Sequence, residues 1–134
     1  WPTATGSAVN RLVLDPSNNY TENAMATVFE MFGDAMGGTK VTCSSSINGV
    51  YDIAVFDEVK NELLIYMINK KQSEESLSTG IDLKNYNINT IEATSFVNDT
   101  NGNGKLIEIT TKVENGTRII INLPKNSLTK VVVK

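Results

Sequence analysis

Acidic side chains are the groups of this 134-residue chain best suited to acid–base chemistry, because the sequence contains no histidine and a single cysteine, Cys43. The missing histidine excludes Ser-His-Asp and Cys-His catalysis, and one cysteine cannot build a structural zinc site. A pair of carboxylates can still hydrolyse a glycosidic bond. No pair here has a sequence context that indicates a cleft, so we expect solvent-facing acids and a chain that is not an enzyme by itself. The acids in or beside predicted strands are Asp52, Asp57, Glu58, Glu62, Glu74, Glu75, Glu92 and Glu108.

A loop rich in asparagine and glycine, residues 98–104, is the candidate metal site of the sequence. Asp99, Asn101 and Asn103 match the first, third and fifth positions of a calcium-binding loop. The rest of the sequence departs from the calcium-loop pattern, because the twelfth position holds Thr110 instead of glutamate and the flanking residues are predicted strands. Turn conformation alone also explains these residues. Calcium at the three positions is therefore one of two interpretations, and we expect no other cofactor.

An aromatic ring beside amide side chains is the second candidate binding feature, because a sugar stacks on the ring while amides hydrogen-bond its hydroxyls. Tyr86 lies between Asn85 and Asn87, and Trp1 also stands outside any apolar alternation. These four residues form the predicted carbohydrate site. An ordinary strand entry, with the ring covering the edge of a core, also explains Tyr86.

The elements that would position these residues change type at Gly37 and Gly38. Before the two glycines, apolar residues recur at helical spacing, which predicts an amphipathic helix over residues 22–36. Gly37 is expected to be the left-handed residue that ends it. The predicted buried stripe of the helix is Met25, Val28, Phe29, Phe32 and Met36.

After Gly38 the apolar residues alternate in short runs, which predicts a mainly β fold, an antiparallel β-sandwich. The chain is then one domain, 1–134, with a helical lead-in over 1–37 and the sandwich over 38–134. Two runs, Leu63–Ile68 and Arg118–Leu123, are almost continuously apolar, which predicts central or doubly covered strands. We expect about eight strands: Thr39–Ser45, Val50–Phe56, Glu62–Asn69, Glu75–Asp82, Ile88–Phe96, Lys105–Val113, Arg118–Leu123 and Leu128–Val133.

Alternation within two of these strands places individual side chains. Tyr51 is in phase with Ile53 and Val55, so we expect it in the core. Cys43 is in phase with Val41, so we expect a buried and inert thiol.

Composition limits the partners of the chain. Charged residues make up 20% of it with a net charge of −3, so no basic field is available to attract nucleic acid or anionic lipid. No apolar run approaches the roughly 18 residues of a membrane span. The chain opens on Trp1 and shows no signal peptide, which is compatible with a processed, exported protein.

Three stretches together resemble the end of a retaining glycoside hydrolase of the arabinofuranosidase, xylosidase or endoglucanase kind: NNYTENAMATVFEMFGDAMGG, VYDIAVFDEVKNELLIYMINK and LTKVVVK. In such enzymes the last helix of a catalytic barrel leads into a β-sandwich. The resemblance covers about residues 20–134, and its most specific element is the order of helix, tight glycine turn and sandwich. It carries no catalytic residues, because the family's catalytic glutamates lie on barrel strands.

The resemblance implies a non-catalytic accessory β-sandwich of a secreted bacterial enzyme that degrades polysaccharides, with the catalytic domain as its partner. Two alternatives stay open. One is an autonomous carbohydrate-binding module that holds polysaccharide on exposed rings, and the other is a cell-surface structural or adhesion sandwich without a sugar ligand. A large exposed apolar patch around the helix would favour the first function. A groove lined by two or more coplanar rings would favour the second.

Overall fold

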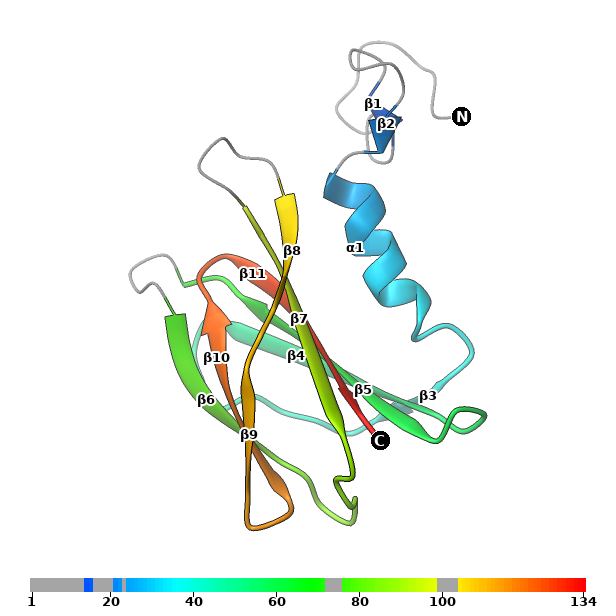
Figure 1. The fold of residues 1–134 in the computed structure, drawn as a ribbon, viewed down its shortest axis with the longest axis vertical. Helices are drawn as coiled ribbons and strands as arrows, with labels where there is room; N and C mark the ends of the chain where they lie inside the picture. The colour runs from blue at the N-terminus through cyan, green and yellow to red at the C-terminus, as the bar shows by residue number, and fades with distance from the viewer. Residues whose placement is uncertain (1–13, 16–20, 23, 72–75, 99–103) are drawn as a thin grey trace.

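The computed structural model consists of two facing β-sheets with one helix on the outside of the larger sheet (Figure 1). It describes residues 14–15, 21–22, 24–71, 76–98 and 104–134. Within these ranges no helix is long and apolar enough to cross a membrane. The elements are β1 (Leu14–Asp15), β2 (Thr21–Glu22), α1 (Ala24–Gly33), β3 (Thr39–Val41), β4 (Val50–Asp57), β5 (Glu62–Asn69), β6 (Ser76–Asp82), β7 (Ile91–Asn98), β8 (Gly104–Glu108), β9 (Thr111–Glu114), β10 (Arg118–Pro124) and β11 (Ser127–Val133).

The larger sheet has six strands in the order β3-β4-β5-β11-β7-β8, and the smaller sheet has three in the order β6-β10-β9. Neighbouring strands in both sheets run antiparallel, as predicted for this mainly β chain. The last strand, β11, lies between β5 and β7 in the middle of the larger sheet. The short β1 and β2 pair with each other.

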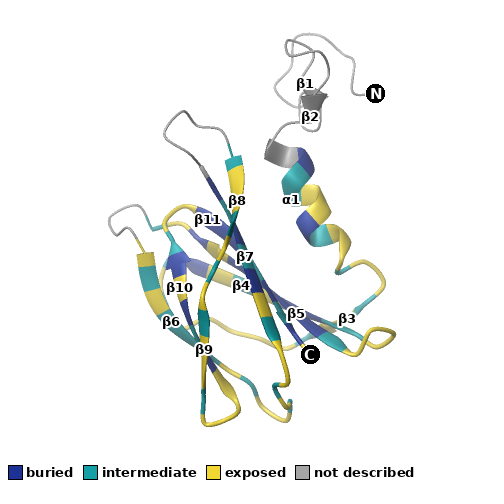
Figure 2. Cartoon of the chain, in the orientation of Figure 1, coloured by how far each residue is buried: buried dark blue, intermediate teal, exposed yellow. Residues whose placement is uncertain are grey.

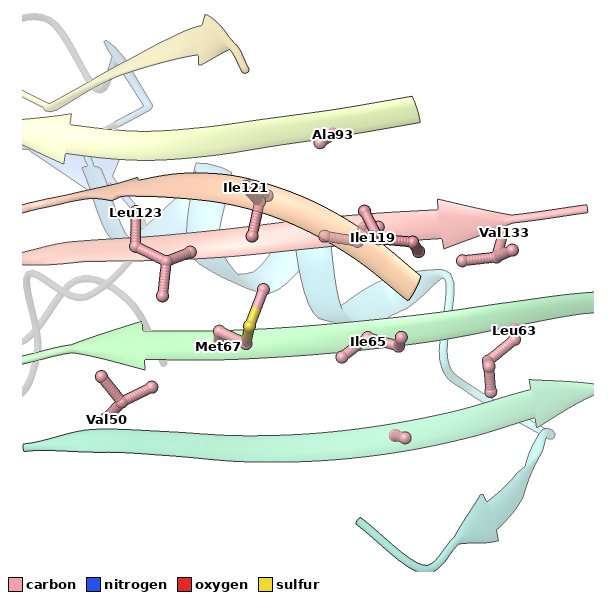
Figure 3. Packing of buried hydrophobic residues seen from close by; sticks show 11 residues of the cluster. Val50, Leu63, Ile65, Met67, Ala93, Ile119, Ile121, Leu123 and Val133 are labelled. Atoms are coloured by element: carbon pink, nitrogen blue, oxygen red, sulfur yellow. The ribbon is translucent and has the colours of Figure 1, made fainter. Parts of the chain in front are cut away.

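Aliphatic side chains from both sheets form the core between them (Figure 3). On β10, Ile119, Ile121 and Leu123 are fully buried, while the residues between them are half-buried or exposed. Burying one such side chain contributes about 1.5–3 kcal/mol relative to leaving it exposed. Facing them from the larger sheet are Val50, Ala54, Leu63, Ile65, Met67, Ala93, Val131 and Val133.

Nine strands, rather than the predicted eight, lie between Thr39 and Val133. The predicted strand Lys105–Val113 is in fact two strands in different sheets, since β8 pairs with β7 and β9 pairs with β10. The chain crosses from one sheet to the other at Ile109 and Thr110, where the Ile109 amide still donates to the Ala93 carbonyl at 2.9 Å. Apolar alternation continues through this crossing, so the pattern alone could not reveal it.

Two side-chain predictions for the first strands are wrong. Tyr51 is 56% exposed, because Val50 and Ala54 are the β4 residues that face the core and Tyr51 lies on the opposite face. Cys43 is exposed, because β3 ends at Val41 and strand alternation does not extend to position 43.

Candidate functional site

The outer face of the larger sheet, which carries α1, is the first candidate site. The helix runs from Ala24 to Gly33, shorter than the predicted 22–36, and its ten residues are too few for stability in isolation. Packing on the sheet supplies that stability. Met31 is buried with Leu64 and Leu128, and the ring of Phe32 stacks on Tyr66 with centroids 4.6 Å apart.

Tyr66 also completes the C-terminal end of the helix. The Tyr66 hydroxyl donates to the Met31 carbonyl at 2.7 Å. The next two carbonyls, of Phe32 and Gly33, accept from Ala35 and Met36, so these three otherwise unpaired groups of the last turn have partners. Burial raises the pKa of Tyr66 to about 12, and the nearby Asp34 carboxylate adds to the shift.

The chain leaves the helix through a second fixed point. The Lys130 ammonium of β11 lies 2.6 Å from the Asp34 carboxylate, and this hydrogen bond is the main reason that the pKa of Asp34 is lowered. Gly37 then adopts a φ of 87°, the left-handed conformation that the sequence predicted for the end of this segment.

Exposed positions occur on α1 and in the turn after it (Figure 2), and two of them hold large apolar residues. The predictions that Phe29 and Met36 are buried are wrong: they are 55% and 84% exposed. Val28 and Phe32 of the predicted stripe do pack on the sheet, with Met31 and Ala35 beside them in place of Phe29 and Met36. The side chain of Met25 lies outside the described part of the chain. We call the exposed apolar residues on α1, β4, β5, β8 and the turn after the helix the helix-side patch: Phe29, Met36, Tyr51, Ile53, Ile68 and Leu106.

The strand register places the sheet members of the patch on the same face as the helix. Tyr51 pairs with Ile68 across β4 and β5. Leu106 of β8 pairs with Phe96 of β7, and Phe96 packs in the cluster under α1. Directly paired strand residues project to the same side of a sheet. The helix therefore covers the centre of an apolar face and leaves its flanks exposed.

A groove of about 820 Å³ between the two sheets is the second candidate site. Its floor is the inner face of β4 and β5, one wall is the β6 segment from Thr79 to Asp82, and residues 42–47 border its mouth. Asp52 lies on this floor, and sequence reasoning missed the groove although Asp52 alternates with Val50 and Ala54. Cys43 is exposed as a residue, but partial burial of its thiol at the mouth, together with the Asp52 carboxylate, raises its pKa to about 11.

Tyr86 borders the same groove, and its ring and hydroxyl both have partners in the fold. The hydroxyl donates to the carbonyls of Asn61 at 3.1 Å and Val133 at 3.2 Å. The ring meets Phe56 edge-on at 6.1 Å, and burial raises the pKa of Tyr86. This arrangement matches the alternative interpretation, a ring that covers the edge of the core.

The other predicted sugar-binding residues are distributed differently. Asn85 and Asn87 are exposed next to Tyr86, and Asn85 has a φ of 60°, which is a turn conformation. Trp1 lies outside the described residues. Sugar binding at these positions stays a prediction.

The predicted calcium ligands Asp99, Asn101 and Asn103 also lie outside the described residues, so that site stays a prediction. In the part of the chain that the structure describes, no three histidine, cysteine or acidic residues are grouped to hold a metal. Several carboxylates there have structural partners. Asp57 accepts from the amides of Val59 and Lys60 in a turn.

No protein-family model matches the sequence, and no curated protein matches it. Solved structures do. A family 30 endoxylanase from Clostridium papyrosolvens matches with a TM-score of 0.68 and 21% identity, over 90% of this chain and 30% of the other. A glycoside hydrolase family 30 subfamily 8 xylanase from Clostridium acetobutylicum matches with a TM-score of 0.73 and 18% identity, over 96% and 32%.

A bifunctional glucanase-xylanase from a metagenome library matches with a TM-score of 0.59 and 18% identity, over 92% of this chain and 21% of the other. This chain therefore spans a third or less of the length of these enzymes. At such low identities the likeness concerns the fold alone. The fold of this chain recurs as a minor part of these glycoside hydrolases.

Proposed function

We propose that this chain is a non-catalytic accessory β-sandwich of an exported, polysaccharide-degrading glycoside hydrolase, and that its helix-side patch docks on the catalytic domain. The observation that carries the proposal is the patch itself. Its position around α1 is the feature that distinguishes a docking domain from an autonomous one. The recurrence of this fold as a minor part of xylanases and a glucanase-xylanase also supports the proposal.

Energetics favour a covered patch. Scattered exposed apolar residues are ordinary, but several on one face mark an interaction site. Tyr51 and Ile68 are neighbours across two strands. Phe29 lies on the exposed side of the helix and Met36 lies in the turn after it. Covering apolar area contributes roughly 25 cal/mol per Å², so a catalytic domain seated here would stabilise both partners.

The ring arrangement does not favour an autonomous sugar-binding module. Among the described residues the close ring pairs are Phe32 with Tyr66 and Phe56 with Tyr86. The first is covered by the packing of α1 on the sheet, and the second is edge-on, whereas a sugar platform needs exposed, coplanar rings. The tests below therefore also decide whether the chain is instead a carbohydrate-binding module or an adhesion sandwich.

The first test is the coding sequence that precedes the codon for Trp1. The proposal expects a catalytic barrel there, followed directly by this chain. A linker rich in serine, threonine and proline would instead indicate an autonomous module, and a coding sequence without a catalytic domain would overturn the proposal.

The second test measures docking. The catalytic domain and this chain are produced as two polypeptides, mixed, and examined by calorimetry and size-exclusion chromatography. Tyr51→Glu and Phe29→Glu should each weaken association by at least about tenfold, because they bury a charge in an apolar contact. Val59→Glu is the matched control, since Val59 is equally apolar and lies on an exposed turn outside the patch. Equal association for all variants would refute docking at this patch.

A further inference from the structure

The two sheets are unequal in width, and the smaller one stops before it covers the larger. β10 packs against β11 and β7, and β9 packs against β7. β6 is the edge strand of the smaller sheet, and within the described residues it pairs with β10 alone. Its other edge faces the groove, where Thr79, Gly80 and Ile81 form the wall. The inner face of β4 and β3 continues beyond that edge.

The free edge of β6 and the floor beneath it provide two different kinds of binding. A sheet edge presents a row of backbone donors and acceptors that another strand can pair with. The floor presents apolar side chains at strand spacing, among them Val50 and Met67 (Figure 3), with Ala54 in the same lining. A ligand that satisfies both must be extended, hydrogen-bonded along its backbone and apolar on alternate side chains.

The size of the groove agrees with one strand. β6 has seven residues, and a seven-residue strand in stacked sheets occupies about 1,100 Å³, from a rise of ~3.3 Å, a strand spacing of ~4.8 Å and a sheet spacing of ~10 Å. The groove measures about 820 Å³. At the same spacings that volume corresponds to about five strand residues, so the groove has room for the central part of one extended strand.

The charged residues that line the groove favour some peptide sequences over others. Asp52 stands on the apolar floor between Val50 and Ala54, and Glu58 lies at the rim. Asp82, also in the lining, already pairs with Arg118 at 3.1 Å. Among the described residues Asp52 forms no ion pair, and its neighbour at the mouth is the neutral Cys43 thiol. A basic side chain on the inward face of an incoming strand would pair with this carboxylate.

We propose that this groove binds an extended peptide strand that pairs with the free edge of β6, alternates apolar side chains toward the floor and places one basic residue opposite Asp52. A second copy of this chain fits less well. In an edge-to-edge dimer of β6 strands, the overhanging β3 and β4 of each copy would occupy the same space. The proposal concerns the inner face of the sheets and does not depend on docking at the helix-side patch.

The experiment uses three fluorescent seven-residue peptides. The first alternates threonine and valine and has a lysine at its centre, on the same face as the valines. The second has glutamate in place of that lysine, and the third has the composition of the first with its valines and threonines grouped in blocks. Anisotropy should show binding of the lysine peptide about tenfold tighter than that of the other two. Asp52→Lys should reverse the preference between lysine and glutamate peptides. Glu30→Lys, on the exposed side of α1, makes the same charge change away from the groove and should leave the preference intact. If Asp52→Lys does not fold, Asp52→Asn should abolish the preference.

Hydrogen exchange identifies the mode of binding. The lysine peptide should protect the amides of Thr79 to Ile81 that face the groove and leave the β9 edge unchanged. Failure of the lysine peptide to bind, or equal affinity of both peptides for the parent chain and Asp52→Lys, would overturn the proposal. Binding that protects no β6 amide would also overturn the proposal and would indicate an apolar small-molecule pocket. A dimer that forms through β6 without any peptide would overturn it as well.

Discussion

Removing one hydroxyl group, in Tyr66→Phe, tests whether the sheet holds the helix through a single hydrogen bond. The Tyr66 hydroxyl is the partner of the Met31 carbonyl at 2.7 Å, and both residues are buried. Phenylalanine preserves the ring that stacks on Phe32. Leaving a buried carbonyl without a partner costs about 1–3 kcal/mol. We expect the variant to unfold with a free energy about 2 kcal/mol lower and to melt roughly 6–10 °C lower.

Urea titration at pH 7.5, monitored by circular dichroism, measures this difference. Tyr51→Phe is the matched control, because it removes the same hydroxyl from a ring that is largely exposed. The control should change the free energy of unfolding by less than about 0.5 kcal/mol. Equal stabilities of the parent and Tyr66→Phe would refute the role of this hydrogen bond.

Alkaline pH gives an independent check of the same contact. The pKa of Tyr66 is raised from 10.0 to about 12 in the folded chain, because an anionic phenolate would be buried and would lie near the Asp34 carboxylate. A raised folded-state pKa contributes stability that is complete below pH 10 and is lost between pH 10 and 12. The difference between these values corresponds to roughly 3 kcal/mol. The advantage of the parent over Tyr66→Phe should therefore disappear in this window, whereas a constant advantage would contradict the reasoning.

Three further predictions concern other parts of the chain. Phe32→Ala should lower the free energy of unfolding by about 2–4 kcal/mol, while Phe29→Ala should change it by less than about 0.5 kcal/mol; similar losses would show that the helix docks differently. Cys43 at pH 8 should react with iodoacetamide about 100-fold more slowly in the folded chain than in urea, since a pKa near 11 leaves ~1 thiolate in 1,000. Asp52→Asn should speed that reaction, and an unchanged rate would remove Asp52 as a cause. The purified chain should release no reducing sugar from xylan, arabinan or β-glucan, and turnover lost on changing one carboxylate would contradict this.

Local patterns predicted those strands whose surroundings are uniform along their length. Glu62–Asn69 is confirmed at both ends, and its continuous apolar run reflects burial on both faces, with Leu63 and Ile65 toward the core and Leu64 and Tyr66 under the helix. The hairpin at Asn115 has positive φ angles at both of its residues, as an Asn-Gly turn requires.

Features set by tertiary arrangement were not predictable in the same way. Apolar residues on the helix are spread over more than half its circumference, so periodicity could not decide whether Phe29 or Met31 faces the sheet. The crossing at Ile109 changes partners without changing alternation. Predicting the groove requires knowing that β6 does not extend over β4. The one indication of the groove in the sequence is the carboxylate of Asp52 at an inward-facing position.

The central place of β11 has a consequence for the order in which the chain can be made and folded. Synthesis proceeds from the N-terminus, so β11 emerges after β5 and β7, yet these two strands meet only through it. Until Val133 has left the ribosome, the two halves of the larger sheet have no common partner, and α1 lacks Leu128 beneath it. The larger sheet of the nascent chain is therefore incomplete until β11 is made, and apolar segments such as Leu63–Met67 are open to aggregation during that interval.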